Sequence, residues 1–335
     1  MILYIGNNLK PKLTNQTTLT LLSNLLRDEG YSVKISSSLN NQLLRLVSML
    51  WAIIKYRKKI DFVLIDTYST KNFYYAFSTS QLCRFLKLRF IPILHGGDLP
   101  SRLDKSPKLS KLIFTNSHKN IAVSNYLKYE FDKRGFESVF IPNIIEIENY
   151  NFLERGFSYP RLLYVRAFAS IYNPEMAIKV LSKVKKEYPK ATLCMVGPEK
   201  DYSFESCKAL TKELGLENSV EFTGMLSKKE WHKKAEDYNI FINTTNIDNA
   251  PVSVMEAMAL GLPVISTKVG GMPFLIEDNE TGILVKKNDI KAMVKAVDNI
   301  CKNEKKTNSL AINARRYVEK FDWNNTKHLW YNILH

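Results

Sequence analysis

Short apolar runs rich in β-branched residues alternate along the chain with longer segments of helical length. Six strand-like runs in the first half lie at residues 2–5, 32–36, 62–66, 90–94, 120–123 and 138–141. Six more in the second half lie at residues 161–165, 191–196, 219–222, 239–242, 263–266 and 282–285. Because most of these runs are predominantly apolar, they predict parallel sheets that helices cover on both faces.

Helical patterns separate most of these strands. In the first half they lie at about residues 18–29, 40–58, 71–87 and 125–134. In the second half they lie at about residues 174–187, 205–214, 228–236, 252–260, 289–302, 308–320 and 323–333. Two series of six alternating strands predict an α/β fold of two doubly wound, Rossmann-like domains. The pattern breaks near residues 143–160, so we expect domains at 1–150 and 151–320, and a closing helix at 321–335.

The composition is that of a globular protein without a membrane span. The chain has 335 residues, of which 45% are hydrophobic and 24% charged, which argues against disorder or low complexity. The longest apolar run, at residues 46–54, is too short to cross a bilayer. No signal peptide is evident, and four scattered cysteines without metal-ligand spacing favour a cytoplasmic protein with free thiols.

The charge is uneven along the chain. The net charge is +15, and residues 1–150 hold 21 basic and 11 acidic side chains. A basic half can attract a nucleic acid, an anionic membrane or a phosphorylated ligand. Patterns typical of nucleic-acid-binding modules are missing from the sequence, so we do not expect a nucleic-acid partner.

The segment 246–285 carries the most informative chemistry. Asp248 ends a loop between a strand and a helix, and Glu256 lies about two helical turns further on, so the two acids can hold different hydroxyl groups of one ligand. The helix begins near Pro251, and its first amides suit an anion or sugar hydroxyls. Gly270 and Gly271 follow the next strand and permit close backbone approach to a ligand.

These residues resemble a known family. The string EAMALGLPVISTKVGGMP at 256–273, preceded by Asp248, resembles the hallmark of retaining glycosyltransferases of family 4, which have the GT-B fold. Further similar segments are RLLYVRAF at 161–168, VGPEKD at 196–201, VEFTGML at 220–226, AVSNYL at 122–127, IPNII at 141–145 and FDWNNTKHLWYNIL near the end. The resemblance implies two domains facing across a cleft and a last helix that crosses back to the first domain.

The resemblance also implies roles for individual residues. Glu256 matches the glutamate that binds the ribose, Asp248 the acid beside the donor sugar, and Arg166 the clamp on the diphosphate. His95 looks like the cleft histidine, and Gly6 like the glycine turn near the phosphates. We expect His95, Arg166 and Asp248 to be catalytic. The expected donor-binding residues are Gly6, Gly197, Gly224, Met225, Asn249, Ala250, Pro251, Val252, Ser253, Glu256, Gly270 and Gly271.

Four positions depart from the family pattern. Asp248 replaces a glutamate, the first loop reads GNNLKPK without a double glycine, and IPNII lacks the glycine that usually follows Asn143. No lysine follows Arg166 closely, where Tyr172 and Asn173 stand instead. The missing lysine matters because a departing diphosphate needs positive charge. The lysines that could substitute are Lys10, Lys12, Lys200 and Lys268.

Each candidate also has a purely structural interpretation. Glu256 could be a surface glutamate, Asp248 a helix N-cap, and Arg166 half of an ion pair at a strand end. His95 could be structural, and Gly270 and Gly271 a tight turn. The segment 40–59 has apolar residues at 43, 46, 47, 50, 53 and 54 and a basic end. It could be a core helix, which we favour, or an interfacial helix on an anionic leaflet, or both.

The expected activity is that of a retaining glycosyltransferase. The resemblance implies transfer from a UDP- or GDP-sugar, without a metal or other cofactor, to a saccharide or polyprenyl-linked acceptor in surface polysaccharide or lipopolysaccharide synthesis. We expect a cytoplasmic location, with peripheral contact to the anionic inner leaflet as an additional possibility. Two alternatives stay open: a catalytically impaired nucleotide-sugar-binding protein, and another GT-B enzyme such as a nucleotide-sugar epimerase.

Overall fold

The chain divides into two compact units. A computed structural model describes residues 1–6, 17–36 and 38–335. Unit 1 comprises residues 1–144 and 323–335, and unit 2 comprises residues 145–322. The boundaries between the units therefore lie a few residues away from those expected at 150 and 320. The segment GNNLKPK, with Lys10 and Lys12, lies mostly outside the described residues.

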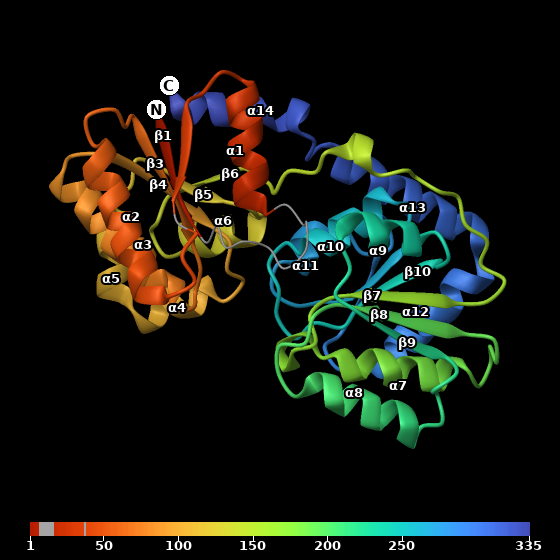
Figure 1. Ribbon diagram of the computed structural model, residues 1–335. Helices are drawn as coiled ribbons and strands as arrows, with labels where there is room; N and C mark the ends of the chain where they lie inside the picture. The colour runs from red at the N-terminus through yellow and green to blue at the C-terminus, as the bar shows by residue number, and fades with distance from the viewer. Residues whose placement is uncertain (7–16, 37) are drawn as a thin grey trace. The chain divides into compact units, whose positions relative to one another are not determined.

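Unit 1 is built on a parallel sheet of six strands (Figure 1). They are β1 (Ile2–Ile5), β2 (Val33–Ser36), β3 (Phe62–Thr67), β4 (Arg89–Leu94), β5 (Asn120–Ala122) and β6 (Ser138–Phe140). The spatial order is β2-β1-β3-β4-β5-β6. The chain therefore changes direction across the sheet between β1 and β3, where doubly wound folds bind their ligands.

Helices cover both faces of this sheet. They are α1 (Thr18–Asp28), α2 (Gln42–Tyr56), α3 (Asn72–Phe85), α4 (Leu99–Lys105), α5 (Pro107–Phe114), α6 (Asn125–Asp132) and α14 (Trp323–Leu334). Buried side chains of α2 to α6 share one hydrophobic core with the sheet. Side chains of α1 and α14 share the core on the other face. Alternate strand residues feed the two cores, as a doubly covered sheet requires.

The last helix completes unit 1, as the sequence predicted. Trp330 and Ile333 of α14 are buried in the same core as Leu22 of α1. Glu29, just after α1, accepts hydrogen bonds from Trp323 Nε1 at 3.0 Å and from Lys327 Nζ at 3.0 Å, as well as one from the Tyr331 hydroxyl. These bonds, led by that of Tyr331, lower the pKa of Glu29 to about 2.

Unit 2 repeats the architecture with a different strand order. Its strands are β7 (Arg161–Val165), β8 (Thr192–Val196), β9 (Val220–Gly224), β10 (Ile240–Asn243), β11 (Val264–Thr267) and β12 (Ile283–Val285). All neighbours are parallel, in the order β12-β11-β10-β7-β8-β9. From β7 the chain builds one half of the sheet and then crosses to β10 to build the other, so the ligand-binding point of this topology lies between β7 and β10.

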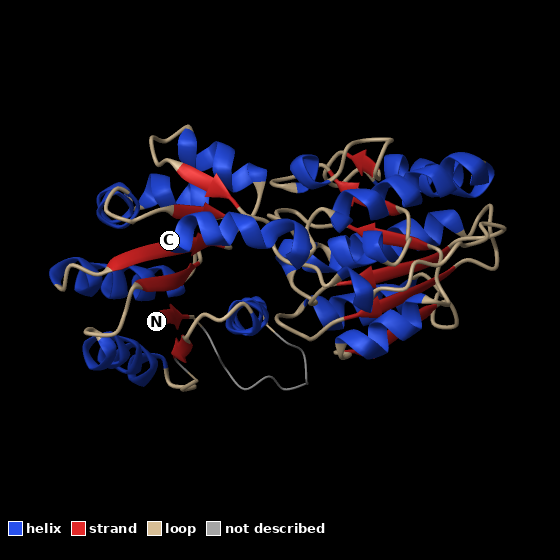
Figure 2. Cartoon of the chain, turned by 90° about the horizontal axis from the view of Figure 1, so that it is seen from above, coloured by secondary structure: helices blue, strands red, loops and turns tan. Residues whose placement is uncertain are grey.

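The helices of unit 2 also cover both faces of its sheet. They are η1 (Ile147–Asn149), η2 (Ser170–Tyr172), α7 (Pro174–Val184), α8 (Ser203–Glu213), α9 (Lys228–Ala235), α10 (Val252–Ala259), α11 (Met272–Leu275), α12 (Ile290–Lys302) and α13 (Glu304–Glu319). Helices α7, α8 and α12 share one core. Figure 2, coloured by secondary structure, shows the strands of each unit enclosed by helices.

The fold class predicted from the sequence is confirmed, and three short helices were missed. Helices α4, α5 and α11 each begin with a proline in the first turn and have between four and eight residues. Segments this short do not display a helical period. None of the helices in the described ranges has both the length and the apolar character needed to cross a bilayer.

The buried face of α2 differs from the prediction. The helix buries Met49, Ala52 and Ile53 together with the side chain of Arg45. Leu43 and Val47, which were assigned to a core-facing stripe, are exposed. The apolar residues of this helix are numerous enough to form two faces, so periodicity alone selected the wrong one.

Candidate functional site

An arginine and an aspartate meet at the switch point of unit 2. Arg166 directly follows β7, and Asp248 lies in the loop after β10. Arg166 Nη2 lies 2.5 Å from Asp248 Oδ2. The ring of Tyr172, from η2, lies under the guanidinium, with 4.3 Å between Cζ and the ring centroid. The neighbouring strand ends therefore bring together two predicted site residues that are 82 positions apart.

Burial and pairing act in opposite directions on Asp248. Burial raises the pKa of its carboxyl group, and the nearby Arg166 guanidinium partly offsets this effect. The backbone N–H of Asn249 also donates to Asp248 Oδ1, at 3.0 Å. Within the described part of the chain, Arg166 Nε has no hydrogen-bond partner. A cation held in place by one carboxylate, with a donor still unused, is suited to bind an anionic ligand.

The loop after β11 lies directly against the Asp248 loop. The Gly271 N–H donates to the Asp248 carbonyl at 3.0 Å. A Cβ at Gly270 would lie 2.1 Å from the Asp248 carbonyl oxygen, and one at Gly271 would lie 1.9 Å from that of Asn249. Glycine is required at both positions because the two backbones pass too closely for a side chain. These glycines therefore fix the loop that carries Asp248.

The loop from Asp248 leads into helix α10. Asn249 and Ala250 form the turn, Pro251 is the cap residue, and Val252 begins the helix. The first backbone donor within the helix is Val254, which bonds to the Pro251 carbonyl. The amides of Val252 and Ser253 precede this bond and point out of the helix N-terminus. Together with the helix dipole, they provide partial positive charge next to the Arg166–Asp248 pair.

Glu256 lies on α10 within a small polar cluster. Its side chain is 4% exposed, and its Oε1 accepts a hydrogen bond from the Tyr150 hydroxyl at 2.9 Å. Lys228 Nζ, at the start of α9, lies 2.8 Å from the same oxygen. The His232 ring packs on Tyr150, and burial lowers its pKa to about 4, so it is neutral at pH 7. Glu256 is thus a buried carboxylate with two partners and not a surface residue.

Two further glycines shape the edge next to Arg166. Gly197 follows β8, and a Cβ there would lie 2.0 Å from the Arg166 carbonyl oxygen. Gly224 ends β9 in a left-handed conformation with a φ of 69°, and its carbonyl accepts a bond from the Gly197 N–H at 2.9 Å. Met225, the next residue, is partly exposed. The loops after β7, β8 and β9 therefore lie side by side.

Of the lysines suggested as replacements for the missing family lysine, the two that the structure describes are not placed at the Arg166–Asp248 pair. Lys200 and Lys268 are both exposed. Lys228, which the sequence did not indicate as a replacement for that lysine, pairs with Glu256 and not with Asp248. The aromatic ring of Tyr172 contacts Arg166 close to the position where the family pattern has its lysine.

The predicted residues of unit 1 also converge on a switch point. His95 follows β4, and its Nε2 lies 2.9 Å from Oδ1 of Asp66 in β3. The Tyr4 hydroxyl donates to the same carboxylate oxygen at 2.9 Å. The Tyr68 ring stacks on the His95 ring at a centroid distance of 5.2 Å. His95 is therefore oriented by a carboxylate and by an aromatic face.

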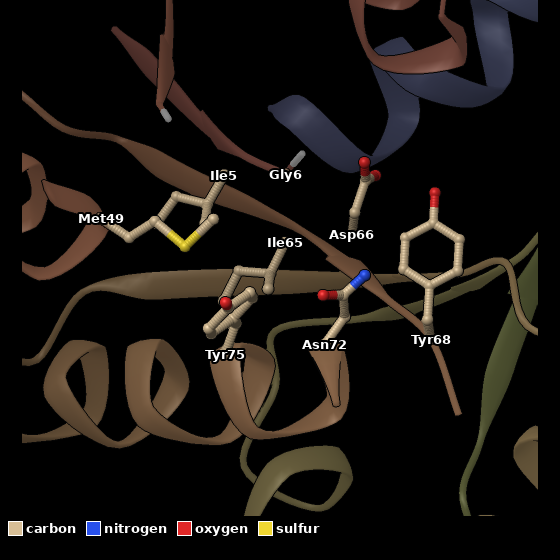
Figure 3. A pocket seen from close by; sticks show the side chains of 8 residues that line it. All are labelled: Ile5, Gly6, Met49, Ile65, Asp66, Tyr68, Asn72 and Tyr75. Atoms are coloured by element: carbon tan, nitrogen blue, oxygen red, sulfur yellow. The ribbon is translucent and has the colours of Figure 1, made fainter. Parts of the chain in front are cut away.

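A small cavity lies next to this carboxylate. Figure 3 shows its lining residues Ile5, Gly6, Met49, Ile65, Asp66, Tyr68, Asn72 and Tyr75. Its volume is about 10 Å³, enough for a single water molecule. A Cβ at Gly6 would lie 2.4 Å from Asp66 Oδ2, so a larger residue there would have to displace this carboxylate. Gly6 thus contributes to the same site as His95, between β1 and β3.

Residues 1–6, 17–36 and 38–335 hold no candidate metal site. No group of three or more His, Cys, Asp or Glu side chains there is arranged to hold a metal ion.

Comparison with known proteins agrees with this geometry. Residues 153–317 match the family described as glycosyl transferases group 1. This region, which makes up most of unit 2, belongs to the group 1 glycosyltransferases. The matched region contains Arg166, Asp248, Glu256 and all the glycines discussed in unit 2.

Curated group 1 relatives align over part of their length. An uncharacterised glycosyltransferase of Haemophilus influenzae is 29% identical over 198 residues, which are 57% of this chain and 55% of that protein. The amylovoran biosynthesis glycosyltransferase AmsK of Erwinia amylovora is 25% identical over 264 residues, which are 74% of this chain and 64% of AmsK. The aligned region thus spans between about half and two thirds of the length of these relatives.

Solved structures share the fold of this chain. Sucrose-phosphate synthase from Thermosynechococcus elongatus superposes with a TM-score of 0.82 at 16% identity, covering 99% of this chain and 97% of that chain. Anabaena HepE in complex with UDP-glucose superposes with a TM-score of 0.78 at 16% identity, covering 99% and 98%. At this identity the likeness shows the fold, which is that of GT-B enzymes.

Several partners of the site residues were not predicted from the sequence. Asp66 and Tyr4 around His95, and Tyr150 and Lys228 around Glu256, all contact their partners across long sequence separations. Asp66 had one usable signal, because it is an acid at the end of an otherwise apolar parallel strand.

Proposed function

We propose that the chain transfers a sugar from a nucleotide-diphosphate donor, a UDP- or GDP-sugar, to a saccharide or polyprenyl-linked acceptor. The observation that carries this proposal is the Arg166–Asp248 pair at the switch point of unit 2. Asp248 lies in the loop that leads into the N-terminus of α10, and the guanidinium keeps an unused Nε donor. Such a place is suited to the charge of a diphosphate.

The donor would lie along the loops of unit 2. Arg166 and the first amides of α10 would bind the diphosphate, and the Glu256 carboxylate would accept hydrogen bonds from ribose hydroxyls. Asp248 would bind hydroxyls of the transferred sugar. The complex of HepE with UDP-glucose, which has the same fold, supports a UDP-sugar as the first donor to test.

The reaction we propose retains the anomeric configuration. The bond between the anomeric carbon and the phosphate oxygen breaks, and a bond from the acceptor hydroxyl to the same face of that carbon forms. The acceptor proton passes to the departing phosphate oxygen. Arg166 and the α10 amides stabilise the negative charge on that oxygen without a metal ion or other cofactor.

The names of related proteins guide the choice of acceptor. AmsK is named for amylovoran biosynthesis, and WaaB, which shares the fold, is a lipopolysaccharide outer core galactosyltransferase. We therefore propose an acceptor in cell-surface polysaccharide or lipopolysaccharide synthesis, modified in the cytoplasm. His95, oriented by Asp66, would contact the donor sugar from unit 1 and support developing charge.

The first experiment measures thermal stability with a panel of UDP-, GDP-, ADP- and CMP-sugars. A ligand at about one hundred times its dissociation constant adds about 2.7 kcal/mol to stability, which gives a clear rise in melting temperature. We expect one nucleotide class to stabilise the parent protein. Arg166→Ala and Glu256→Gln should lose most of that rise.

Matched controls separate binding from folding in this experiment. Arg316→Ala on α13 and Glu213→Gln on α8 change the same residue types at exposed positions away from the switch point. They should retain the full rise. If no nucleotide sugar stabilises the parent, or if all four variants respond alike, the donor site is not where we place it.

A second candidate function is donor binding without turnover. It is favoured by the ring of Tyr172 against Arg166, where the family pattern has a lysine that supplies positive charge. The test is release of the nucleoside diphosphate from the stabilising donor, with and without acceptor extracts. Release that is lost in Arg166→Ala would exclude this candidate, whereas binding without any release would favour it over transfer.

A further inference from the structure

Helix α2 has an apolar face that the fold does not use. Its buried face, formed by Arg45, Met49, Ala52 and Ile53, packs on the sheet of unit 1. The opposite face carries five exposed apolar side chains: Leu43, Leu44, Val47, Trp51 and Ile54. At 100° per residue these five lie within an arc of about 100°. Trp51 is 61% exposed and Leu43 is 70% exposed.

Such a face is unusual on a helix that covers a sheet. A surface helix normally has one apolar stripe toward the core and polar residues opposite. Here the polar residues are displaced to the flanks, with Ser48 and Lys55 beside the apolar arc. Contiguous exposed apolar side chains of this kind mark a surface that binds another molecule or a membrane.

The charge around this face has a single sign. Residues 30–97 contain ten basic and only two acidic side chains. The two acids are Asp61 and Asp66, and Asp66 is buried beside His95. The basic residues are Lys34, Arg45, Lys55, Arg57, Lys58, Lys59, Lys71, Arg84, Lys87 and Arg89. The last turn of α2 and the three residues that follow it carry four of these ten.

The geometry points to an anionic lipid bilayer as the partner of this face. We propose that α2 lies in the plane of a membrane, with Leu43, Val47 and Trp51 inserted at the boundary between headgroups and acyl chains. Lys55 and the 57–59 cluster would bind lipid phosphates beside it. A tryptophan in an apolar face flanked by basic residues is typical of such interfacial helices.

A second copy of the chain is a poorer occupant. In a two-fold dimer through α2, the same patch of each copy would meet its equivalent. Two strongly basic surfaces would then come together with few acidic side chains to pair with, and like charges across an interface are costly. An anionic membrane supplies the opposite charge and accepts the apolar arc at the same time.

Trp51 provides a direct spectroscopic test. The other three tryptophans, Trp231, Trp323 and Trp330, are buried, so a change at an exposed tryptophan reports Trp51. We expect emission to shift to the blue, and brominated lipids to quench it, with vesicles containing about 30 mol% phosphatidylglycerol. Vesicles of pure phosphatidylcholine should give much weaker effects. Trp51→Phe should remove the spectral shift while the protein still co-floats with vesicles.

Flotation of variants with the same vesicles tests both components of the surface. Leu44→Gln with Val47→Gln should weaken binding by at least about tenfold. Lys58→Glu with Lys59→Glu should weaken it by about fivefold or more for each charge removed. The matched controls are Ile312→Gln and Lys305→Glu with Lys306→Glu, all exposed on α13 of unit 2, which should bind as the parent does.

Three results would overturn the proposal. The parent protein could fail to bind anionic vesicles, or bind neutral ones equally well. The α2 variants could bind as tightly as the α13 controls. Light scattering could show a dimer that the Leu44→Gln, Val47→Gln variant dissociates, which would make a second copy the occupant. None of these measurements uses a nucleotide sugar, so they are independent of the proposed activity.

Discussion

The Asp248 carboxylate is mostly buried, and its partner in an ion pair is the Arg166 guanidinium. Burial raises its pKa, so the ionised form is unfavourable in the folded protein, and Arg166 offsets part of this cost. When the pKa of an acid is higher in the folded than in the unfolded protein, the acid stabilises the fold at pH values below its unfolded pKa. This stabilisation is lost as the pH rises through the folded pKa. Removal of Arg166 should therefore do most damage where Asp248 is ionised.

We predict that Arg166→Ala destabilises unit 2 by about 1–3 kcal/mol at neutral pH, because it leaves a buried charge without its partner. The loss should shrink as the pH falls toward the range in which Asp248 becomes protonated. Urea unfolding of parent and variant at about pH 7.5 and about pH 5 measures this difference. A loss that is equal at both values would contradict the assignment.

A companion substitution checks the cause of that loss. Asp248→Asn removes the ionisable group at nearly constant volume. In the Arg166→Ala, Asp248→Asn double variant, stability at neutral pH should recover most of what Arg166→Ala lost, and the dependence on pH should disappear. Additive losses from the two substitutions would show that the pair is not energetically coupled.

Asp66 is the group in unit 1 that orients His95. We predict that Asp66→Asn lowers kcat of transfer by about tenfold or more, because the histidine loses the carboxylate that fixes its ring and tautomer. Stabilisation by the nucleotide sugar, which we place in unit 2, should change little. His95→Ala with Asp66→Asn should be no slower than His95→Ala alone. A larger effect on donor binding than on turnover would contradict this role.

At the residue level, the sequence singled out candidate site positions but not the side chains that contact them. His95, Arg166, Asp248 and Glu256 stand next to strand ends or in a recognisable motif, so they could be singled out. Lys228 approaches Glu256 from a helix that has no motif of its own, and Tyr150 does so from the residue after η1, near the start of unit 2. Such contacts depend on three-dimensional packing, which local patterns do not contain.

At the level of elements, close approach of backbones determines the shape of the donor loops. We predict that Gly271→Ala costs more than about 2 kcal/mol, because its Cβ would lie 1.9 Å from the Asn249 carbonyl oxygen and one of the two loops must move. It should also reduce the thermal shift caused by the donor. The measurement is unfolding with and without the stabilising nucleotide sugar.

Gly215→Ala is the control for this glycine. Gly215 has a φ of 64° and nothing within 4 Å of an added Cβ, so substitution introduces backbone strain without a clash. The expected cost is about 1 kcal/mol, with the donor response unchanged. Equal effects of the two substitutions would contradict a specific role for the contact between the loops.

The sequence predicted long and short elements with different success. All twelve strands were placed within about two residues because apolar runs between turns have clear limits. The face of α2 was assigned wrongly because a helix with apolar residues on both sides has no unique stripe. Its second face became visible only when the exposure of Leu43 and Trp51 was known.

At the level of the whole molecule, unit 1 depends on a helix that follows unit 2 in the sequence. We predict that Trp330→Ala destabilises unit 1 by about 3–5 kcal/mol, because it empties a large volume in the core beneath α14. Trp51→Ala, the same change on the exposed face of α2, should alter stability by less than about 0.5 kcal/mol. Urea unfolding followed by circular dichroism compares them.

Unit 2 should be affected much less by the Trp330 change. The only tryptophan in unit 2 is Trp231, which is buried on α9. In a variant with phenylalanine at the three other tryptophans, its emission follows unit 2 alone. When Ile333→Ala weakens the core beneath α14, we expect the unfolding midpoint reported by Trp231 to stay the same. An equal loss of stability in both units would show that they unfold together.

The position of α14 also has a consequence for synthesis on the ribosome. Residues 145–322 form a continuous unit, whereas unit 1 is assembled from segments on both sides of it. Domains commonly fold in order from the N-terminus as the chain emerges. Here the second unit can complete its core first, while the face of the earlier sheet that α1 and α14 share stays only partly covered until the helix at 323–334 arrives. During that interval the exposed strands of unit 1 are a substrate for chaperones.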